Sequence, residues 1–199
     1  MIDLTFFESI VRAFIPLFAI MDPFISVPIF LSLTRKDNPA KKRLIAMEAV
    51  GIAAGLLFLF LLFGQGLLSV LGISLASMQI AGGIILVIMG IELVLSLSFP
   101  KEKGKSKKVS PAAVVIGTPL LTGPGVITTA IILSGQYGIL VTSIASVLAL
   151  AFTWFILRHS DSVTKLIGET GTELLSRIMG LLLVAIAVQF ILSGIKGVF

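Results

Sequence analysis

Long runs of apolar residues, separated by short polar segments, dominate the pattern of this chain. A helix crosses a bilayer with about 20 apolar residues in succession. The pattern therefore predicts an all-α polytopic membrane protein with six transmembrane helices. Their predicted ranges are 8–34, 44–63, 77–97, 110–135, 138–157 and 177–196.

The first and fourth predicted spans differ from the other four because they contain proline. Five of the eight prolines fall within 14–34 and 112–135. Proline inside a helix removes a backbone donor and clashes with the carbonyl four residues earlier. Such a break is tolerated at membrane depth only inside the protein or beside a wet cavity. We predict that both spans are discontinuous, with new helices starting at Pro23 and Pro124.

These two breaks occupy matching positions in the two halves of the chain. Asp22-Pro23 aligns with Gly123-Pro124 at an offset of 101 residues, in the first span of each half. Each half then holds three spans, and an odd number of spans makes the second half insert upside down. The predicted organisation is a 3+3 inverted repeat, an arrangement typical of proteins that work by alternating access.

Basic residues are concentrated in three of the predicted loops. Thirteen of the 15 Lys and Arg residues follow the first, third and fifth spans. Part of this charge lies in the linker 100–109, which joins the first repeat (1–99) to the inverted second repeat (110–199) within one membrane domain. By the positive-inside rule these loops are cytoplasmic and both termini lie outside the cell membrane. Topology thus explains the basic charge, and we expect no nucleic-acid partner.

Composition narrows the classes of chemistry that the chain can perform. Hydrophobic residues make up 57% and charged residues 13%, whereas soluble domains are about 45–50% apolar and about 25% charged. The absence of Cys excludes disulfides and thiolate nucleophiles. The predicted spans contain no GxSxG, no HExxH and no acidic pair at catalytic spacing. We therefore expect no enzyme activity, no cofactor and no metal site.

The chemistry of the two breaks suits a small zwitterion. The helix starts at Pro23 and Pro124 leave backbone N–H groups unpaired and carry a partial positive charge, which favours a carboxylate. The helix ends before the breaks expose carbonyl oxygens, which suit an ammonium group. Asp22 either caps its helix only, or also contacts an ammonium group or a coupling cation. Gly123 and Gly125 allow close approach of the backbone to a ligand.

Several further side chains flank the breaks. Each hydroxyl could line a cavity or bond to a carbonyl one turn back, and Phe24 could form a wall or simply pack. Glu48 and Glu92 either pair with basic loops or carry a coupling proton. The candidate coupling residues are Asp22, Glu48 and Glu92. The candidate substrate-binding residues are Asp22, Pro23, Phe24, Ser26, Thr118, Thr122, Gly123, Pro124, Gly125 and Thr128.

Three stretches of the chain resemble the MarC-related family of membrane proteins. They are Met21-Asp22-Pro23-Phe24, the segment from Gly117 to Gly125 that reads GTPLLTGPG, and Ile80-Ala81-Gly82-Gly83. The resemblance covers essentially the whole chain. It implies six helices in an inverted repeat, with broken first and fourth spans. It also implies uptake of small neutral amino acids, glycine or alanine, coupled to an ion gradient of protons or sodium, with protons favoured.

Two alternatives within membrane transport remain open at this point. One is an exporter of amino acids or drugs, because topology does not set direction. The other is a passive channel, in which the proline breaks and Asp22 would form a filter. Small-residue faces such as Gly51-x-x-x-Gly55 leave a homo-oligomer open as well. Besides the substrate, the expected partners are membrane lipid and the coupling ion.

Overall fold

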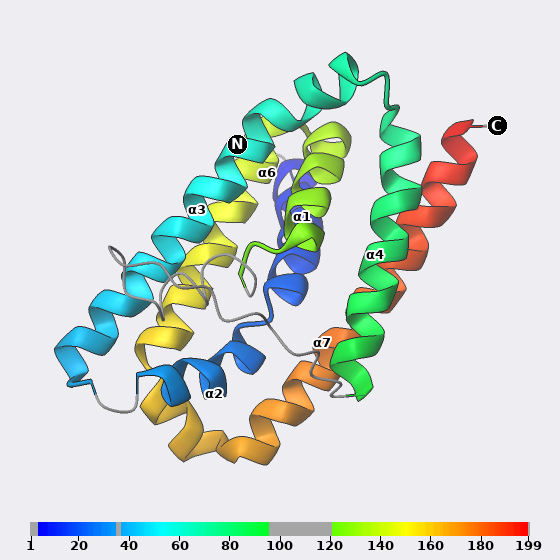
Figure 1. Cartoon of the computed structure of the whole chain (residues 1–199). Coiled ribbons are helices and arrows are strands. Elements are labelled where there is room, and N and C mark those ends of the chain that lie inside the picture. Colours follow the sequence, from blue (N-terminus) through cyan, green and yellow to red (C-terminus); the bar gives the residue numbers. More distant parts are fainter. Residues whose placement is uncertain (1–3, 35–36, 96–120, 199) are drawn as a thin grey trace.

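The computed structural model describes residues 4–34, 37–95 and 121–198, and the secondary structure of these residues is entirely helical (Figure 1). The predicted linker 100–109 and the part of the fourth span before residue 121 lie outside the described residues. The helices are α1 (Leu4–Met21), α2 (Pro23–Leu33), α3 (Pro39–Val70), α4 (Leu75–Leu95), α6 (Pro124–Arg158) and α7 (Ser160–Val198).

Five helical segments of the described residues are long and apolar enough to cross a membrane. These segments are Thr5–Leu31, Pro39–Val70, Leu75–Leu95, Gly125–Arg158 and Thr170–Val198. The first, which runs across the break between α1 and α2, corresponds to the first predicted span. The chain is therefore an all-helical membrane protein.

The count of five differs from the predicted six because of α6. Its apolar segment has 34 residues, about 51 Å at 1.5 Å per residue, against a hydrocarbon core of about 30 Å. Gly138 interrupts it with φ 82° and ψ 161°, a left-handed backbone that glycine adopts without strain. Residues 124–137 thus continue the predicted fourth span, and residues 139–158 match the predicted fifth.

Helix α3 is longer than its apolar run of residues 44–63. Asn38 caps its start, because the side-chain Oδ1 accepts a hydrogen bond from the Lys41 N–H at 2.8 Å. Pro39 follows at the first helical position, where the missing N–H costs nothing. The cap and the proline therefore start the helix in the polar loop, five residues before the apolar run.

Helices α4 and α7 pack along each other through glycine. A Cβ atom on Gly90 would lie 2.9 Å from the carbonyl oxygen of Gly180, and one on Gly180 would lie 2.9 Å from that of Gly90. Further along the pair, a Cβ on Gly83 would lie 2.8 Å from the carbonyl oxygen of Ala187. The two backbones are therefore in direct contact, as in small-residue packing between membrane helices.

Helix α6 packs on α1, α3 and α4. Residues 124–137 contact α3, where the Gln65 Nε2 donates to the Ser134 Oγ at 3.1 Å, and α4, where a Cβ on Gly82 would overlap the methyl group of Thr128. Residues 139–158 contact α1, where the rings of Phe14 and Phe152 meet edge-on. Helix α2 packs on α7.

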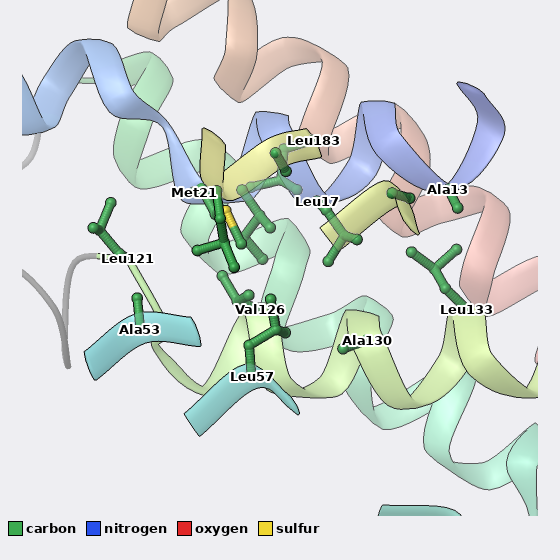
Figure 2. Close-up of a cluster of buried hydrophobic side chains, with 14 of the residues drawn as sticks. Ala13, Leu17, Met21, Ala53, Leu57, Leu121, Val126, Ala130, Leu133 and Leu183 are labelled. Atoms are coloured by element: carbon green, nitrogen blue, oxygen red, sulfur yellow. The ribbon is translucent and has the colours of Figure 1, made fainter. Parts of the chain in front are cut away.

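The buried core lies between the two helix breaks. Figure 2 shows the side chains of Leu17, Met21 and Leu183 gathered with those of Leu121 and Val126. Met21 directly precedes the first break, and Leu121 lies two residues before Gly123 at the second. Apolar packing therefore holds the end of α1 against the residues on either side of the start of α6.

The two ends of the bundle differ in what they carry. The two termini lie toward one end, and the starts of α3 and α7 lie toward the other (Figure 1). At that second end, the Lys42 Nζ contacts the Asp161 Oδ1 at 2.9 Å. This ion pair joins the loop after the first predicted span to the loop after the fifth.

Candidate functional site at the helix breaks

The first span is broken at Asp22, as predicted. Asp22 has φ 32° and ψ 74°, a left-handed conformation that Asp tolerates better than most residues. Its Oδ1 accepts a hydrogen bond from the Ile25 N–H at 3.3 Å, so the side chain caps α2. Pro23 takes the first helical position and, having no N–H, leaves the carbonyl of Ala19 without its usual donor.

The carboxylate of Asp22 is buried, with 2% of its surface exposed. Its Oδ1 accepts a second hydrogen bond, at 3.2 Å, from the hydroxyl of Ser176 on α7. Its Oδ2 is also buried but has no hydrogen-bond partner among the described residues. A buried, unpaired carboxylate oxygen is costly. The capping role therefore uses one oxygen and leaves the other available to a cation or an ammonium group.

At the predicted second break the structure describes the chain only from residue 121 on, where α6 starts with a different residue before its proline. Gly123 caps α6 in an extended conformation, with φ −64° and ψ 174°, and supplies no side-chain hydrogen bond. The N–H groups of Val126 and Ile127 donate to its carbonyl oxygen at 3.0 and 3.3 Å. This break thus offers backbone and the positive end of a helix dipole, but no charge on a side chain.

The structure brings the two breaks together through Gly125. A Cβ atom there would lie 2.5 Å from the Ile20 Cδ1, 2.6 Å from the Met89 Sδ and 3.2 Å from the Leu86 Cδ2. Ile20 lies two residues before Asp22, so the start of α6 lies against the end of α1. The absence of a side chain at Gly125 is what permits this approach.

For two of the hydroxyl and aromatic candidates, the structure shows a bond within the helix or a packing contact. The Ser26 hydroxyl is buried and donates to the Asp22 carbonyl oxygen at 3.1 Å, the bond one turn back. Phe24 is half-buried and meets the Phe18 ring edge-on, with centroids 6.4 Å apart. Thr122 and Thr128 are buried near the second break. Thr118 lies outside the described residues.

The two glutamates proposed as coupling residues lie on α3 and α4. Glu48 and Glu92 are both half-buried. Neither forms an ion pair with another described residue; the four described ion pairs involve other acids. Their expected pairing with basic loops is thus not found within the described part of the chain. No group of three potential metal ligands occurs there either.

Sequence reasoning missed Ser176, which contacts Asp22 from 154 positions away. Thr172 and Ser176 are each 2% exposed and lie one helical turn apart, in line with the buried Gly180. That spacing is visible in the sequence as two hydroxyl residues just before the sixth predicted span, in line with its glycine-bearing face. It could have indicated a polar contact, but not the partner.

The break between α1 and α2 within an apolar span, together with the buried carboxylate, defines an integral membrane protein with a polar site inside its helical bundle. The chain belongs to the family described as MarC family integral membrane protein, which matches residues 7–199. The family assignment made from the DPF and TGPG elements is therefore confirmed.

Individual relatives match over nearly their whole length. A UPF0056 membrane protein of Aquifex aeolicus is 37% identical, over 94% of this chain and 92% of the relative. The UPF0056 inner membrane protein YhgN of Escherichia coli K12 is 35% identical, over 95% and 97%. A UPF0056 membrane protein of Methanocaldococcus jannaschii is 35% identical, over 98% of both chains. No solved structure matches significantly.

Proposed function

We propose that this protein is a secondary active transporter that takes up small neutral amino acids, glycine and alanine, by alternating access coupled to protons. The observation that carries the proposal is the buried, unpartnered Oδ2 of Asp22 beside a second helix break. The oxygen suits the ammonium group of an amino acid. The start of α6 suits its carboxylate. The proposal includes no catalytic step and no cofactor.

The closeness of the two breaks supports a small substrate. Side-chain atoms of Ile20, Met89 and Leu86 lie within 3.2 Å of where a Cβ on Gly125 would be. A ligand that bridges Asp22 and the start of α6 therefore has little room for a side chain of its own. Glycine and alanine carry the smallest side chains among the amino acids.

The proposed architecture is the six-helix 3+3 inverted repeat. The packing of the half-helices that follow the two breaks supports it. Helix α2 packs on α7, and residues 124–137 pack on α4. The half-helix of each repeat thus contacts the third span of the other repeat. Two repeats related by a pseudo-two-fold axis make such reciprocal contacts. Rocking of such halves around a fixed central site is the usual basis of alternating access.

We place the protein in the cell (inner) membrane with both termini outside and the basic loops in the cytoplasm. The Lys42–Asp161 ion pair supports this orientation, because it holds two of those loops at one end of the bundle. The concentration of Lys and Arg in these loops gives the direction.

A carboxyl group within the membrane takes up the coupling proton. The candidates are Asp22, Glu48 and Glu92, none of which pairs with a described Lys or Arg side chain. Intramembrane carboxyl groups of this kind form proton relays in transporters. Neutralising the coupling residue is expected to remove the dependence of uptake on an imposed proton gradient.

The test is uptake by purified protein in proteoliposomes. Radiolabelled glycine, alanine, leucine and aspartate, and a cationic drug, are each supplied with an imposed proton gradient, with a sodium gradient, or with neither. We expect saturable uptake of glycine and alanine that the proton gradient stimulates. Non-saturating flux would instead identify a channel. Movement of drug, or outward pumping of amino acid against its gradient, would identify an exporter.

A further inference from the structure

The hydroxyl of Ser176 bonds across the bundle, whereas several other described hydroxyls bond to the carbonyl one turn back. Ser26, Thr34 and Thr142 each donate to the carbonyl oxygen four residues earlier in their own helix. This is the ordinary arrangement for hydroxyls inside helices. Ser176 instead donates its only proton across the bundle to the Asp22 Oδ1, at 3.2 Å. The bond links the last helix of the chain to the first break.

We propose that Ser176 is a positioning residue of the substrate site, which orients the Asp22 carboxylate so that Oδ2 faces the ligand. The proposal rests on the function proposed above and deepens it. The terminal torsion of an aspartate is broad, so one hydrogen bond leaves the carboxylate free to turn. Donors from two separate elements, the Ile25 N–H and the Ser176 hydroxyl, fix Oδ1 and thereby the direction of Oδ2.

The position of Ser176 is itself set by the packing of α7 on α4. Gly180 lies one turn after Ser176, and its backbone lies against Gly90 and Leu93 of α4. A Cβ on Gly180 would lie 2.8 Å from the Leu93 Cβ, an atom next to the backbone that has no freedom to move away. Interiors packed this closely resist small displacements. The donor is therefore held in place by a neighbouring helix.

The first experiment measures glycine affinity of the purified full-length chain by titration calorimetry. Ser176→Ala removes the donor, and we expect the Kd for glycine to rise about tenfold, the size of one hydrogen bond to a charged group. Ser176→Thr keeps a hydroxyl and should return the Kd to within about twofold of wild type. Ser193→Ala on the same helix is the control, since the Ser193 hydroxyl contacts only Gln189 among the described residues.

A double-mutant cycle separates positioning from a purely structural role. Asp22→Glu keeps the charge but moves it by one methylene, out of register with Ser176. In that background we expect Ser176→Ala to change the Kd by less than about twofold, because the bond is already lost. An equal tenfold loss in both backgrounds would mean that Ser176 acts without Asp22, and would overturn the inference.

A second readout needs no ligand and so separates this inference from the proposed function. A hydrophobic carbodiimide, dicyclohexylcarbodiimide, labels carboxyl groups in membranes, and mass spectrometry follows the rate at Asp22. We expect Ser176→Ala to change this rate several-fold, with wild-type rates in Ser176→Thr and Ser193→Ala. Identical rates in all variants overturn the positioning role. A wild type that binds no amino acid, yet shows this labelling pattern, overturns the proposed substrate and leaves the positioning role supported.

Discussion

The helix starts at the two breaks both have proline at the first helical position, but the residues before the prolines differ in charge and in backbone conformation. Asp22 adopts a left-handed backbone, caps α2 with its side chain and keeps one buried oxygen unpaired. Gly123 is extended and caps α6 with backbone alone. One break therefore offers a negative charge and the other only N–H groups and a helix dipole. A ligand with one positive and one negative end can then bind in only one orientation.

The largest effect is expected from removing the charge at the first break. Asp22→Asn keeps a residue that tolerates the left-handed backbone and can still cap α2. We expect initial glycine uptake in proteoliposomes to fall at least about a hundredfold, because loss of a buried charged partner costs about 3–5 kcal/mol. The melting temperature in detergent should change little. Normal uptake by this variant would mean that Asp22 is not a ligand.

The next effect comes from making the two breaks alike. Gly123→Asp puts a second carboxylate at the start of α6, where the extended backbone accepts any residue. We expect the N-cap to stabilise the helix by about 1 kcal/mol, while repulsion of the substrate carboxylate lowers uptake at least tenfold. Gly123→Asn has nearly the same shape without the charge and is the matched control. Equal losses in both variants would indicate a steric effect and argue against charge recognition at this break.

The close approach of α1 and α6 at Gly125 predicts the next effect in size, a loss of stability. In Gly125→Ala the new methyl group overlaps Ile20 and Met89, and overpacking of this kind costs about 1–3 kcal/mol. Gly51→Ala on α3 is the control, since a Cβ there meets nothing within 4 Å. Thermal unfolding in detergent should show a lower melting temperature for Gly125→Ala alone. A drop of the same size in both variants would contradict the packing described here.

The smallest effect tests whether an unpartnered buried atom is by itself functional. Thr153 is fully buried, and its Oγ1, like the Asp22 Oδ2, has no described partner. We expect Thr153→Val to leave uptake unchanged and to be neutral or slightly stabilising. Thr142→Val removes a bond of 2.9 Å to the Gly138 carbonyl oxygen and should cost about 1 kcal/mol. A loss of uptake in Thr153→Val would mean that a buried polar atom without a partner does not by itself distinguish Asp22 as a substrate ligand.

Much of the fold could be predicted from local sequence. Proline at a helix start and apolar runs are local signals, and they correctly gave the break at Asp22 and the helix starts at Pro39 and Pro124. The apolar runs did not give helix ends, because caps in polar loops extend a helix beyond its apolar part. Helix α3 shows this at its start, since Asn38 and Pro39 begin it five residues before the apolar run.

The contacts of the site could be predicted only in part. The burial of Asp22 follows from its place within an apolar span. Its bond to Ser176 depends on how α7 crosses α2, which no spacing in the sequence specifies. The hydroxyl of Ser26 was a candidate for the cavity, but its bond to the Asp22 carbonyl oxygen serves its own helix. Local chemistry indicated which residues are polar, and tertiary packing decided which of them meet.

The glycine contact between α4 and α7 has a consequence for how the protein can move. A Cβ atom on either Gly90 or Gly180 would lie 2.9 Å from the carbonyl oxygen of the other, so lengthwise sliding of the pair would meet backbone rather than flexible side chains. On the function proposed above, a movement that opens Asp22 to either side of the bilayer would therefore carry both helices together. The hydroxyl of Ser176 would move with that pair, so the same movement would make or break its hydrogen bond to the Asp22 carboxylate.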